Sequence, residues 1–104
     1  MEYISIDKLH EIVPNMGSEE LILDVRSEEE YEEGHIKGSR RQSHDRVSEI
    51  ADELKGYKAV YVHCMMGGRA QKASEALAAA GLDNVVCVSQ GGMKRWQEMG
   101  WETE

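Results

Sequence analysis

The sequence predicts an α/β domain built on a mainly parallel β-sheet, and three observations support this fold class. The chain has 104 residues, which suits one domain with one hydrophobic core and leaves little room for a second. Apolar segments of strand length alternate along the chain with segments of helical periodicity. Most of the apolar segments are continuous, as is typical of parallel strands covered on both faces. We therefore expect one domain over residues 1–104.

The elements follow one another in a simple order. From the N-terminus they are strand Tyr3–Ser5, helix Asp7–Val13, strand Leu21–Val25, helix Ser27–Gly34, a longer helix ending before Gly56, strand Ala59–His63, helix Ala70–Ala80, strand Val85–Val88 and helix Gly92–Met99. The four strand segments are rich in β-branched and other apolar residues. Each strand is followed by a helical segment, which gives the βαβ connections of a parallel sheet.

The expected helix ends rest on residues that cap or break helices. Ser5 and Ser27 are suitable N-caps, and Pro14 ends the first helix. The longer helix has Ser43 or Asp45 as its expected cap. Its apolar residues follow helical spacing; they are Val47, Ile50, Ala51 and Leu54. Gly81 and Gly100 follow the last two helices, where glycine favours a helix C-terminus.

Composition argues against several function classes. The chain carries 12 Lys and Arg against 20 Asp and Glu, a net charge of −8, so its surface repels phosphate backbones and nucleic acid is a poor partner. No apolar segment approaches the ~20 residues that span a bilayer. The N-terminus lacks the basic and apolar regions of a secretory signal. We expect a cytoplasmic protein that binds neither nucleic acid nor membrane.

The two cysteines, Cys64 and Cys87, are expected to be free thiols, because each lies in or at the end of an apolar strand-like segment. There is no Cys-x-x-Cys pair and no Cys/His pair at zinc-finger spacing, so no metal site is expected. Cys87, within Val-Val-Cys-Val, is expected to be a core residue.

Cys64 stands where chemistry is expected. It follows an apolar strand, and in open α/β sheets ligands bind beyond the carboxyl ends of strands. Gly67 and Gly68 allow a tight loop, and a helix begins near Arg69. Loop N–H groups and the positive helix end can then converge on the sulfur and stabilise a nucleophilic thiolate. The alternative is a buried structural cysteine beside a turn. We expect Cys64 at the base of a shallow pocket.

The size of this loop separates two chemistries. Cysteine-dependent phosphatases use a Cys-x5-Arg loop of seven residues to hold a tetrahedral oxyanion, whereas Cys64 to Arg69 is a Cys-x4-Arg loop of six. The smaller ring favours the outer sulfur of a persulfide. A phosphatase or arsenate reductase is therefore disfavoured, and the presence of Cys64 disfavours an inactive scaffold.

The chain resembles the rhodanese-like, single-domain sulfurtransferases in three separate motifs. These are Asp24-Val25-Arg26 followed by Glu30-Tyr31 and Gly34-His35-Ile36-Lys37-Gly38-Ser39; Cys64-Met65-Met66-Gly67-Gly68-Arg69-Ala70; and Gly91-Gly92 with Trp96. The resemblance covers almost the whole chain. It implies a mainly parallel five-stranded sheet with helices on both faces.

The resemblance also implies a reaction. Cys64 would take a sulfane sulfur from a small anionic donor such as thiosulfate and pass it, as a persulfide, to cyanide in an assay or to a thiol or protein in the cell. The amides of Met65, Met66, Gly67, Gly68 and Arg69 would form the substrate cradle, with Arg69 as its charged edge. No metal or organic cofactor is implied. The alternative within this resemblance is a persulfide-relay or protein-interaction module with little free thiosulfate activity.

Other residues near the motifs are expected to have structural roles. Arg40-Arg41-Gln42 replaces the apolar segment usual in the family and predicts an edge strand, with added positive charge near the cleft as the alternative. Ser43-His44-Asp45 contains the three residue types of a catalytic triad, but the side chains of consecutive residues cannot adopt the geometry of a triad.

The remaining motif residues are expected to support the fold. His35 is expected to make a structural hydrogen bond, and Asp24 and Arg26 an internal ion pair with Glu30 or a backbone bond. Met65 and Met66 give the loop an apolar wall or a docking surface, with adaptable packing as the alternative. Trp96 and Trp101 are expected to cover the edge of the core.

Overall fold

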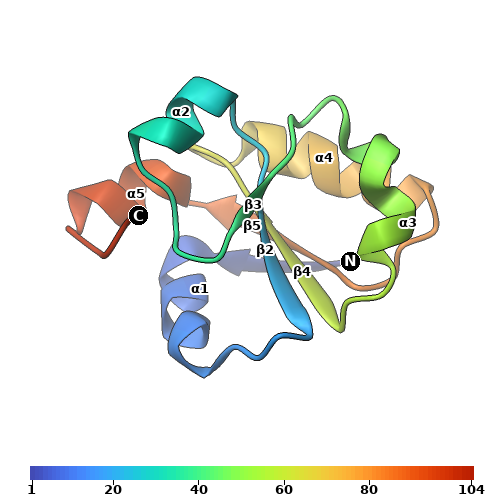
Figure 1. Cartoon of the computed structure of the whole chain (residues 1–104), viewed down its shortest axis with the longest axis horizontal. Helices are drawn as coiled ribbons and strands as arrows, with labels where there is room; N and C mark the ends of the chain where they lie inside the picture. Colours follow the sequence, from blue (N-terminus) through green and yellow to red (C-terminus); the bar gives the residue numbers. More distant parts are fainter.

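The computed structural model describes all 104 residues and shows a five-stranded parallel sheet with helices on both faces, as predicted (Figure 1). The strands are β1 (Glu2–Ser5), β2 (Glu20–Asp24), β3 (Arg40–Arg41), β4 (Ala59–His63) and β5 (Val85–Gln90). The helices are α1 (Ile6–Ile12), α2 (Glu28–Glu33), α3 (Ala51–Leu54), α4 (Gly68–Ala79) and α5 (Gly92–Glu98). There are also two 3₁₀ helices, η1 (Val13–Asn15) and η2 (Val47–Ile50).

The strands lie in the order β1-β5-β4-β2-β3, and every neighbouring pair is parallel. All carboxyl ends therefore lie at one edge of the sheet. β4 is the central strand, between β5 and β2. The residue that follows β4 is Cys64, so the thiol lies at the middle of that edge.

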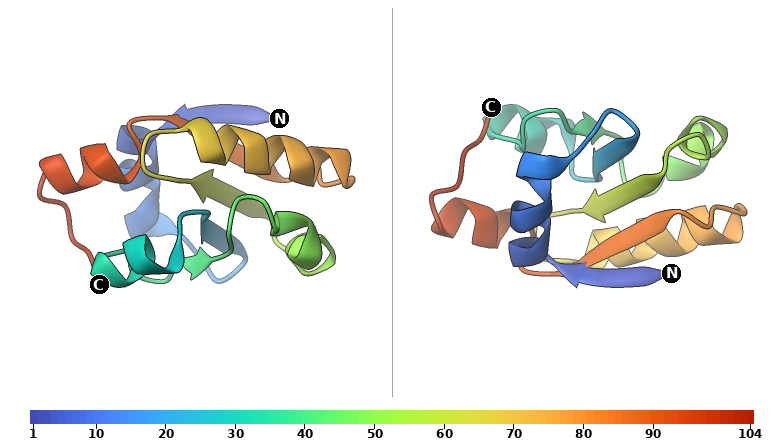
Figure 2. Two further views of the ribbon diagram at one scale, coloured as in Figure 1. Left: turned by 90° about the horizontal axis from the view of Figure 1, so that it is seen from above. Right: turned by 90° about the horizontal axis from the view of Figure 1, so that it is seen from below.

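Side chains alternate between two apolar layers. Leu21 and Leu23 of β2 pack with η2, α3 and α4, whereas Ile22 packs on the opposite face with α1 and α5. Figure 2 shows α1 and α5 at one side of the sheet and α3 and α4 at the other. Because both faces are covered, the three inner strands β2, β4 and β5 are largely apolar and buried, and this is the pattern that predicted a parallel sheet.

Local capping explains two helix starts. The Ser5 Oγ accepts a hydrogen bond from the Lys8 amide at 3.1 Å and caps α1. Ser27 and Glu30 form a reciprocal capping box at the start of α2. Pro14 lies within η1, where the α-helical bonding of α1 has already ended. These helix ends agree with the sequence prediction to within one or two residues.

The predicted N-cap of the helix before Gly56 was wrong. Neither Ser43 nor Asp45 caps a helix, because the Ser43 hydroxyl donates instead to the Asp45 carboxylate at 2.6 Å. Helical structure begins at Val47 as η2 and continues as α3. The residue before η2, Arg46, makes no capping hydrogen bond with its side chain, which pairs with Glu49 instead. The apolar spacing was correct all the same, since Val47, Ile50, Ala51 and Leu54 are all buried.

The segment around Arg41 is an edge strand, as predicted. β3 has two residues, pairs only with β2, and both of its side chains are partly exposed. Short, charged edge strands resist pairing with other chains. No helix of the protein is long and apolar enough to cross a membrane.

Candidate functional site at the Cys64 loop

Residues 64–67 connect the central strand β4 to α4, and the Cys64 sulfur lies against the start of that helix. Its Sγ accepts hydrogen bonds from the amides of Gly67 at 3.0 Å and Ala70 at 3.3 Å. Gly67 belongs to the predicted cradle, but Ala70 lies outside it. The sequence does not reveal Ala70 because the bond depends on how the first turn of α4 curls over the sulfur.

The other four amides of the predicted cradle have no partner. The N–H groups of Met65, Met66, Gly68 and Arg69 donate no hydrogen bond within the chain. They lie in the loop and the first turn of a 12-residue helix. Unpartnered amides at a helix N-terminus attract negative charge. The loop therefore has free hydrogen-bond donors beside the Cys64 sulfur.

Only one of the two loop glycines is required by the backbone. Gly67 has φ +121°, and a Cβ there would lie 2.5 Å from the Ser89 carbonyl oxygen. Gly68 has no positive φ, and no atom lies within 4 Å of the position that its Cβ would occupy. The expectation that both glycines are needed for the tight loop is therefore wrong for Gly68.

The loop is fixed from the other side by α5. The Met93 amide donates to the Cys64 carbonyl at 2.8 Å, and the Lys94 amide donates to the Met65 carbonyl at 3.0 Å. Gly92 permits this approach, because a Cβ there would lie 2.5 Å from the Cys64 carbonyl oxygen. The Gly91-Gly92 motif, noted in the sequence only as part of a pattern, thus anchors the Cys64 loop.

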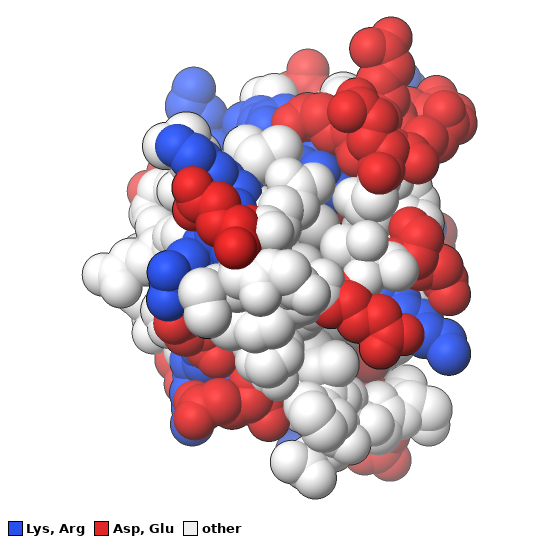
Figure 3. Space-filling model, turned by 90° about the vertical axis from the view of Figure 1, so that its left-hand side faces the viewer, with Lys and Arg blue, Asp and Glu red and all other residues white.

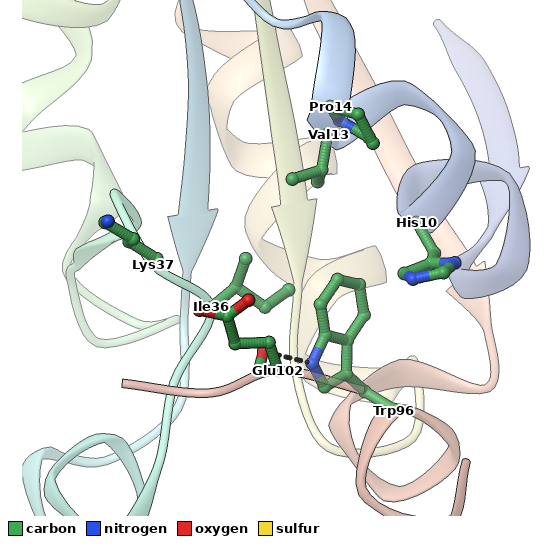
Figure 4. A pocket seen from close by; sticks show the side chains of 7 residues that line it. All are labelled: His10, Val13, Pro14, Ile36, Lys37, Trp96 and Glu102. Carbon is green, nitrogen blue, oxygen red and sulfur yellow. Dashed lines mark hydrogen bonds between the residues drawn. The ribbon is translucent and has the colours of Figure 1, made fainter. Parts of the chain in front are cut away.

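The thiol is not at the base of a pocket, and that expectation was wrong. Cys64 is 1% exposed, and none of the three cavities of the protein is lined by it. Met66, two residues further on, is 65% exposed. The cavity shown in Figure 4 has a volume of about 280 Å³ and lies elsewhere, between α1, α5 and the segment around Ile36 and Lys37. The sulfur is thus covered by its own loop.

Arg69 does not stand free at the rim. Its Nη1 and Nη2 donate to the two carboxylate oxygens of Glu30 at 2.6 and 2.9 Å. The expected pairing of Glu30 with Arg26 was therefore wrong. The hydrogen bonds from the Arg69 guanidinium lower the pKa of Glu30 from 4.5 to about 2; partial burial opposes this shift, and the Ser27 hydrogen bonds add to it. Glu30 is therefore ionised at neutral pH.

Arg26 has a different partner. It is 1% exposed and pairs with the equally buried Asp24, the Nη2–Oδ2 distance being 2.8 Å. Its Nη2 also donates to the Gly34 carbonyl at 2.8 Å. The ion pair lies at the end of β2, and the hydrogen bond to Gly34 joins it to the end of α2. Arg26 and Asp24 thus support the fold beside the site. The predicted backbone bond is confirmed, whereas the ion pair is formed between these two residues and not with Glu30.

His63, next to Cys64, is a buried residue that no sequence motif singled out. Its side chain is fully buried, neither ring nitrogen has a hydrogen-bond partner, and Nε2 lies 3.8 Å from Asp24 Oδ2. Burial lowers the pKa of His63, and the Asp24 charge opposes this only in part. In the sequence, the only signal for a role near the site was its position at the end of an apolar strand, directly before Cys64. Its pairing with Asp24 of β2 is seen only in the structure.

The remaining predicted residues lie away from the sulfur. The His35 Nδ1 lies 2.9 Å from the Tyr31 carbonyl and the ring stacks on Tyr31, which confirms a structural role. Trp96 is buried and stands edge-on to Trp101, which covers that edge of the core. Cys87 is buried, and both cysteines are free. No group of three or more His, Cys, Asp or Glu side chains is placed to hold a metal ion.

Comparison with known proteins gives consistent matches to one domain type. The family model of the rhodanese-like domain matches residues 6–99. Over 75 residues, 72% of this chain, the sequence is 31% identical to an uncharacterized protein of Bacillus subtilis (strain 168), YqhL, and 36% identical to a putative sulfur carrier protein of the same organism, YrkF. The matched part spans 59% and 40% of those two proteins.

A solved structure shows the same fold over its whole length. The crystal structure of a rhodanese-like domain protein from Staphylococcus aureus superposes with a TM-score of 0.82 at 30% sequence identity. The match covers 100% of this chain and 99% of that one. The order of strands and helices is therefore shared from end to end.

Proposed function

Because the chain belongs to the rhodanese-like domain family, we propose that it is a sulfurtransferase in which Cys64 carries the sulfur as a persulfide. The donor is a small sulfane-sulfur compound such as thiosulfate, and the acceptor is a thiophile: cyanide in an assay, a thiol or a protein in the cell. Residues 1–104 act as one domain. Two free thiols suit a reducing compartment, so we place the activity in the cytoplasm.

The reaction needs only the thiolate and the loop amides. The Cys64 thiolate attacks the sulfane sulfur of thiosulfate; a new S–S bond forms, the S–S bond of thiosulfate breaks, and sulfite leaves with its electron pair. Cyanide then attacks the outer sulfur of the persulfide, thiocyanate leaves, and the thiolate is restored. Charge and atoms balance in both steps, and no oxidant is consumed.

The observation that carries this proposal is the set of donors around the sulfur. Gly67 and Ala70 hold Sγ, and the amides of Met65, Met66, Gly68 and Arg69 remain free to bind a second atom carrying negative charge. Such charge develops on the outer sulfur of a persulfide and on the departing sulfite. Amides already in position stabilise it without reorganisation.

A second candidate function is a persulfide-relay module that exchanges sulfur with one protein partner. Two observations favour it: Cys64 is 1% exposed beneath its loop, and a relative is named a putative sulfur carrier protein. In such a relay, contact of the partner with the exposed Met66 would open the loop. Thiosulfate:cyanide turnover by the purified protein alone separates the two functions, since a relay shows little of it.

Mass spectrometry tests the shared part of both functions. After incubation with thiosulfate or a thiol persulfide, Cys64 should gain the mass of one sulfur atom, and addition of cyanide should remove it. Cys64→Ser should gain nothing, because a serine hydroxyl ionises far too weakly to attack and cannot carry a persulfide. A folded Cys64→Ser protein that still transfers sulfur at the original rate would overturn the assignment.

A further inference from the structure

The Arg69 guanidinium, the only full positive charge within the Cys64 loop and the first turn of α4, is occupied. Both of its terminal nitrogens bind the Glu30 carboxylate, at 2.6 and 2.9 Å. The side chains of Arg69 and Glu30 are 32% and 25% exposed. A bidentate pair in such partial shelter is screened less than one in open solvent.

Glu30 is itself fixed independently of Arg69. Its Oε1 accepts hydrogen bonds from the Ser27 amide and the Ser27 hydroxyl, both at 3.0 Å. The capping box of α2 thus holds the carboxylate in place. Arg69 can turn toward a bound anion only by leaving an anchored, ionised partner.

The surroundings of this pair are acidic. Four more glutamates of α2, Glu28, Glu29, Glu32 and Glu33, are exposed. Figure 3 shows a dense group of acidic side chains on the face that includes this end of the molecule. Other basic side chains near this end of the fold lack a carboxylate partner: Arg41, which donates to the Arg26 carbonyl, and the exposed Lys72 of α4 and Lys94 of α5. None of them lies in the Cys64 loop.

We infer that Glu30 is a positioning residue that sets the donor class of this site: by occupying Arg69, it makes Cys64 favour thiol persulfides over thiosulfate. A thiol persulfide carries at most one negative charge on its sulfurs, whereas thiosulfate carries two. With the Arg69 charge neutralised by Glu30 and the acidic α2 nearby, the binding of thiosulfate is therefore disfavoured more strongly than the binding of a thiol persulfide. This inference rests on the proposed sulfurtransferase function.

The step with the favoured donor is balanced. The Cys64 thiolate attacks the outer sulfur of R–S–SH, a Cys64 S–S bond forms, and the donor S–S bond breaks. The thiolate R–S⁻ leaves with the electron pair, and the proton stays on the new persulfide. No additional reactant is required.

The test compares the rates at which two donors load one sulfur atom onto Cys64. Each rate is measured by rapid quenching and mass spectrometry. The donors are thiosulfate and 2-hydroxyethyl persulfide, at low ionic strength. Glu30→Gln keeps the capping box, because glutamine serves at this position as well as glutamate, but it removes the charge that masks Arg69. Glu29→Gln is the matched control, since Glu29 lies on the same helix and its exposed side chain forms neither a hydrogen bond nor an ion pair.

We expect Glu30→Gln to load from thiosulfate roughly fivefold to tenfold faster than the original protein, with a much smaller change for the persulfide. Glu29→Gln should change the ratio of the two rates little. Adding Arg69→Ala to Glu30→Gln should remove the gain. A folded Glu30→Gln protein that loads from thiosulfate no faster than before would overturn the inference, because Glu30 would then only support Arg69.

The original protein provides a test that does not depend on any variant. Added salt should speed its loading from thiosulfate, since screening weakens the repulsion of the dianion. Slower loading with added salt would show that an unmasked cation attracts thiosulfate, and would also overturn the inference. If neither donor loads Cys64 in any variant, the proposed function itself fails. If both donors load Cys64 but Glu30→Gln leaves the ratio of their rates unchanged, only the inference about Glu30 fails.

Discussion

Cys64 and Cys87 belong to the same apolar layer of the sheet, yet only Cys64 has amides aimed at its sulfur. Cys87 lies in the middle of β5 and is fully buried. Burial raises the pKa of the Cys87 thiol, which keeps it protonated. Two residues of the same type therefore have different expected chemistry, and the difference comes from their neighbours.

Replacing Cys87 with serine should leave sulfur loading of Cys64 per folded molecule unchanged. It should lower the free energy of unfolding by about 1–2 kcal/mol, because a hydroxyl is more costly to bury than a thiol. Denaturant unfolding measures the stability and mass spectrometry the loading. Loss of loading in a folded Cys87→Ser protein would contradict the structural role.

His63 should make the protein less stable in mild acid. Its folded-state pKa is lowered from 6.5 by burial. As the pH falls below 6.5 the unfolded chain therefore binds a proton that the folded chain does not, and stability decreases until the folded-state pKa is reached. In His63→Gln this part of the decrease should be absent, a difference of about 1 kcal/mol between pH 6.5 and 5. The measurement is the free energy of unfolding of both proteins at several pH values. An equal decrease in the two proteins between pH 6.5 and 5 would refute the prediction.

Among the secondary-structure elements, α2 and α4 are joined across 39 residues of sequence by the Glu30–Arg69 pair. The sequence of either helix by itself does not predict this contact. α2 has no buried residue, and its run of acidic side chains is typical of a helix face exposed to solvent. One of them is instead directed at the start of α4. The pair couples the capping box of one helix to the first turn of the other.

The stability that this pair contributes should depend on pH. The pKa of Glu30 is lowered from 4.5 to about 2, so the contribution is fully present above 4.5 and is lost as the pH falls toward 2. Glu30→Gln should cost about 1 kcal/mol of unfolding free energy at pH 7, since the pair is partly exposed, and little near pH 2. Urea unfolding across this range is the measurement. A cost that does not vary with pH would show that the charge is not involved.

For the whole molecule, the Cys64 loop is held between two layers. α4 supplies the amides that meet the sulfur, while α5, from the opposite face of the sheet, binds the loop carbonyls. The loop therefore depends on the correct docking of the C-terminal helix, which is far from it in sequence. At Gly92 the two parts are too close for a side chain, because a Cβ there would lie 2.5 Å from the Cys64 carbonyl oxygen.

Gly92→Ala should disturb both the loop and the fold. Its Cβ would overlap the Cys64 carbonyl oxygen, and the backbone has φ +44°. We expect a loss of about 3 kcal/mol in unfolding free energy and slower sulfur loading. Gly68→Ala is the stability control, since nothing lies within 4 Å of its Cβ position. Equal stability of the two variants would contradict the contact with α5.

The sequence by itself determined the alternating elements, the parallel sheet, the caps at Ser5 and Ser27, and the position of Cys64 at the end of a strand. Periodicity, capping and glycine conformation act over a few neighbouring residues, and a sequence displays them directly. The failure at Ser43 and Asp45 is of the same local kind, because each side chain took the other as its partner.

Only the tertiary structure decided which distant groups meet. It paired Glu30 with Arg69, placed the Ala70 amide on the sulfur, left His63 buried without a hydrogen bond, and covered Cys64 with its own loop. Each of these depends on the relative placement of whole helices and strands. A carboxylate on a helix pairs with whichever cation the packing of the sheet brings within reach, and no local pattern in the sequence records that distance.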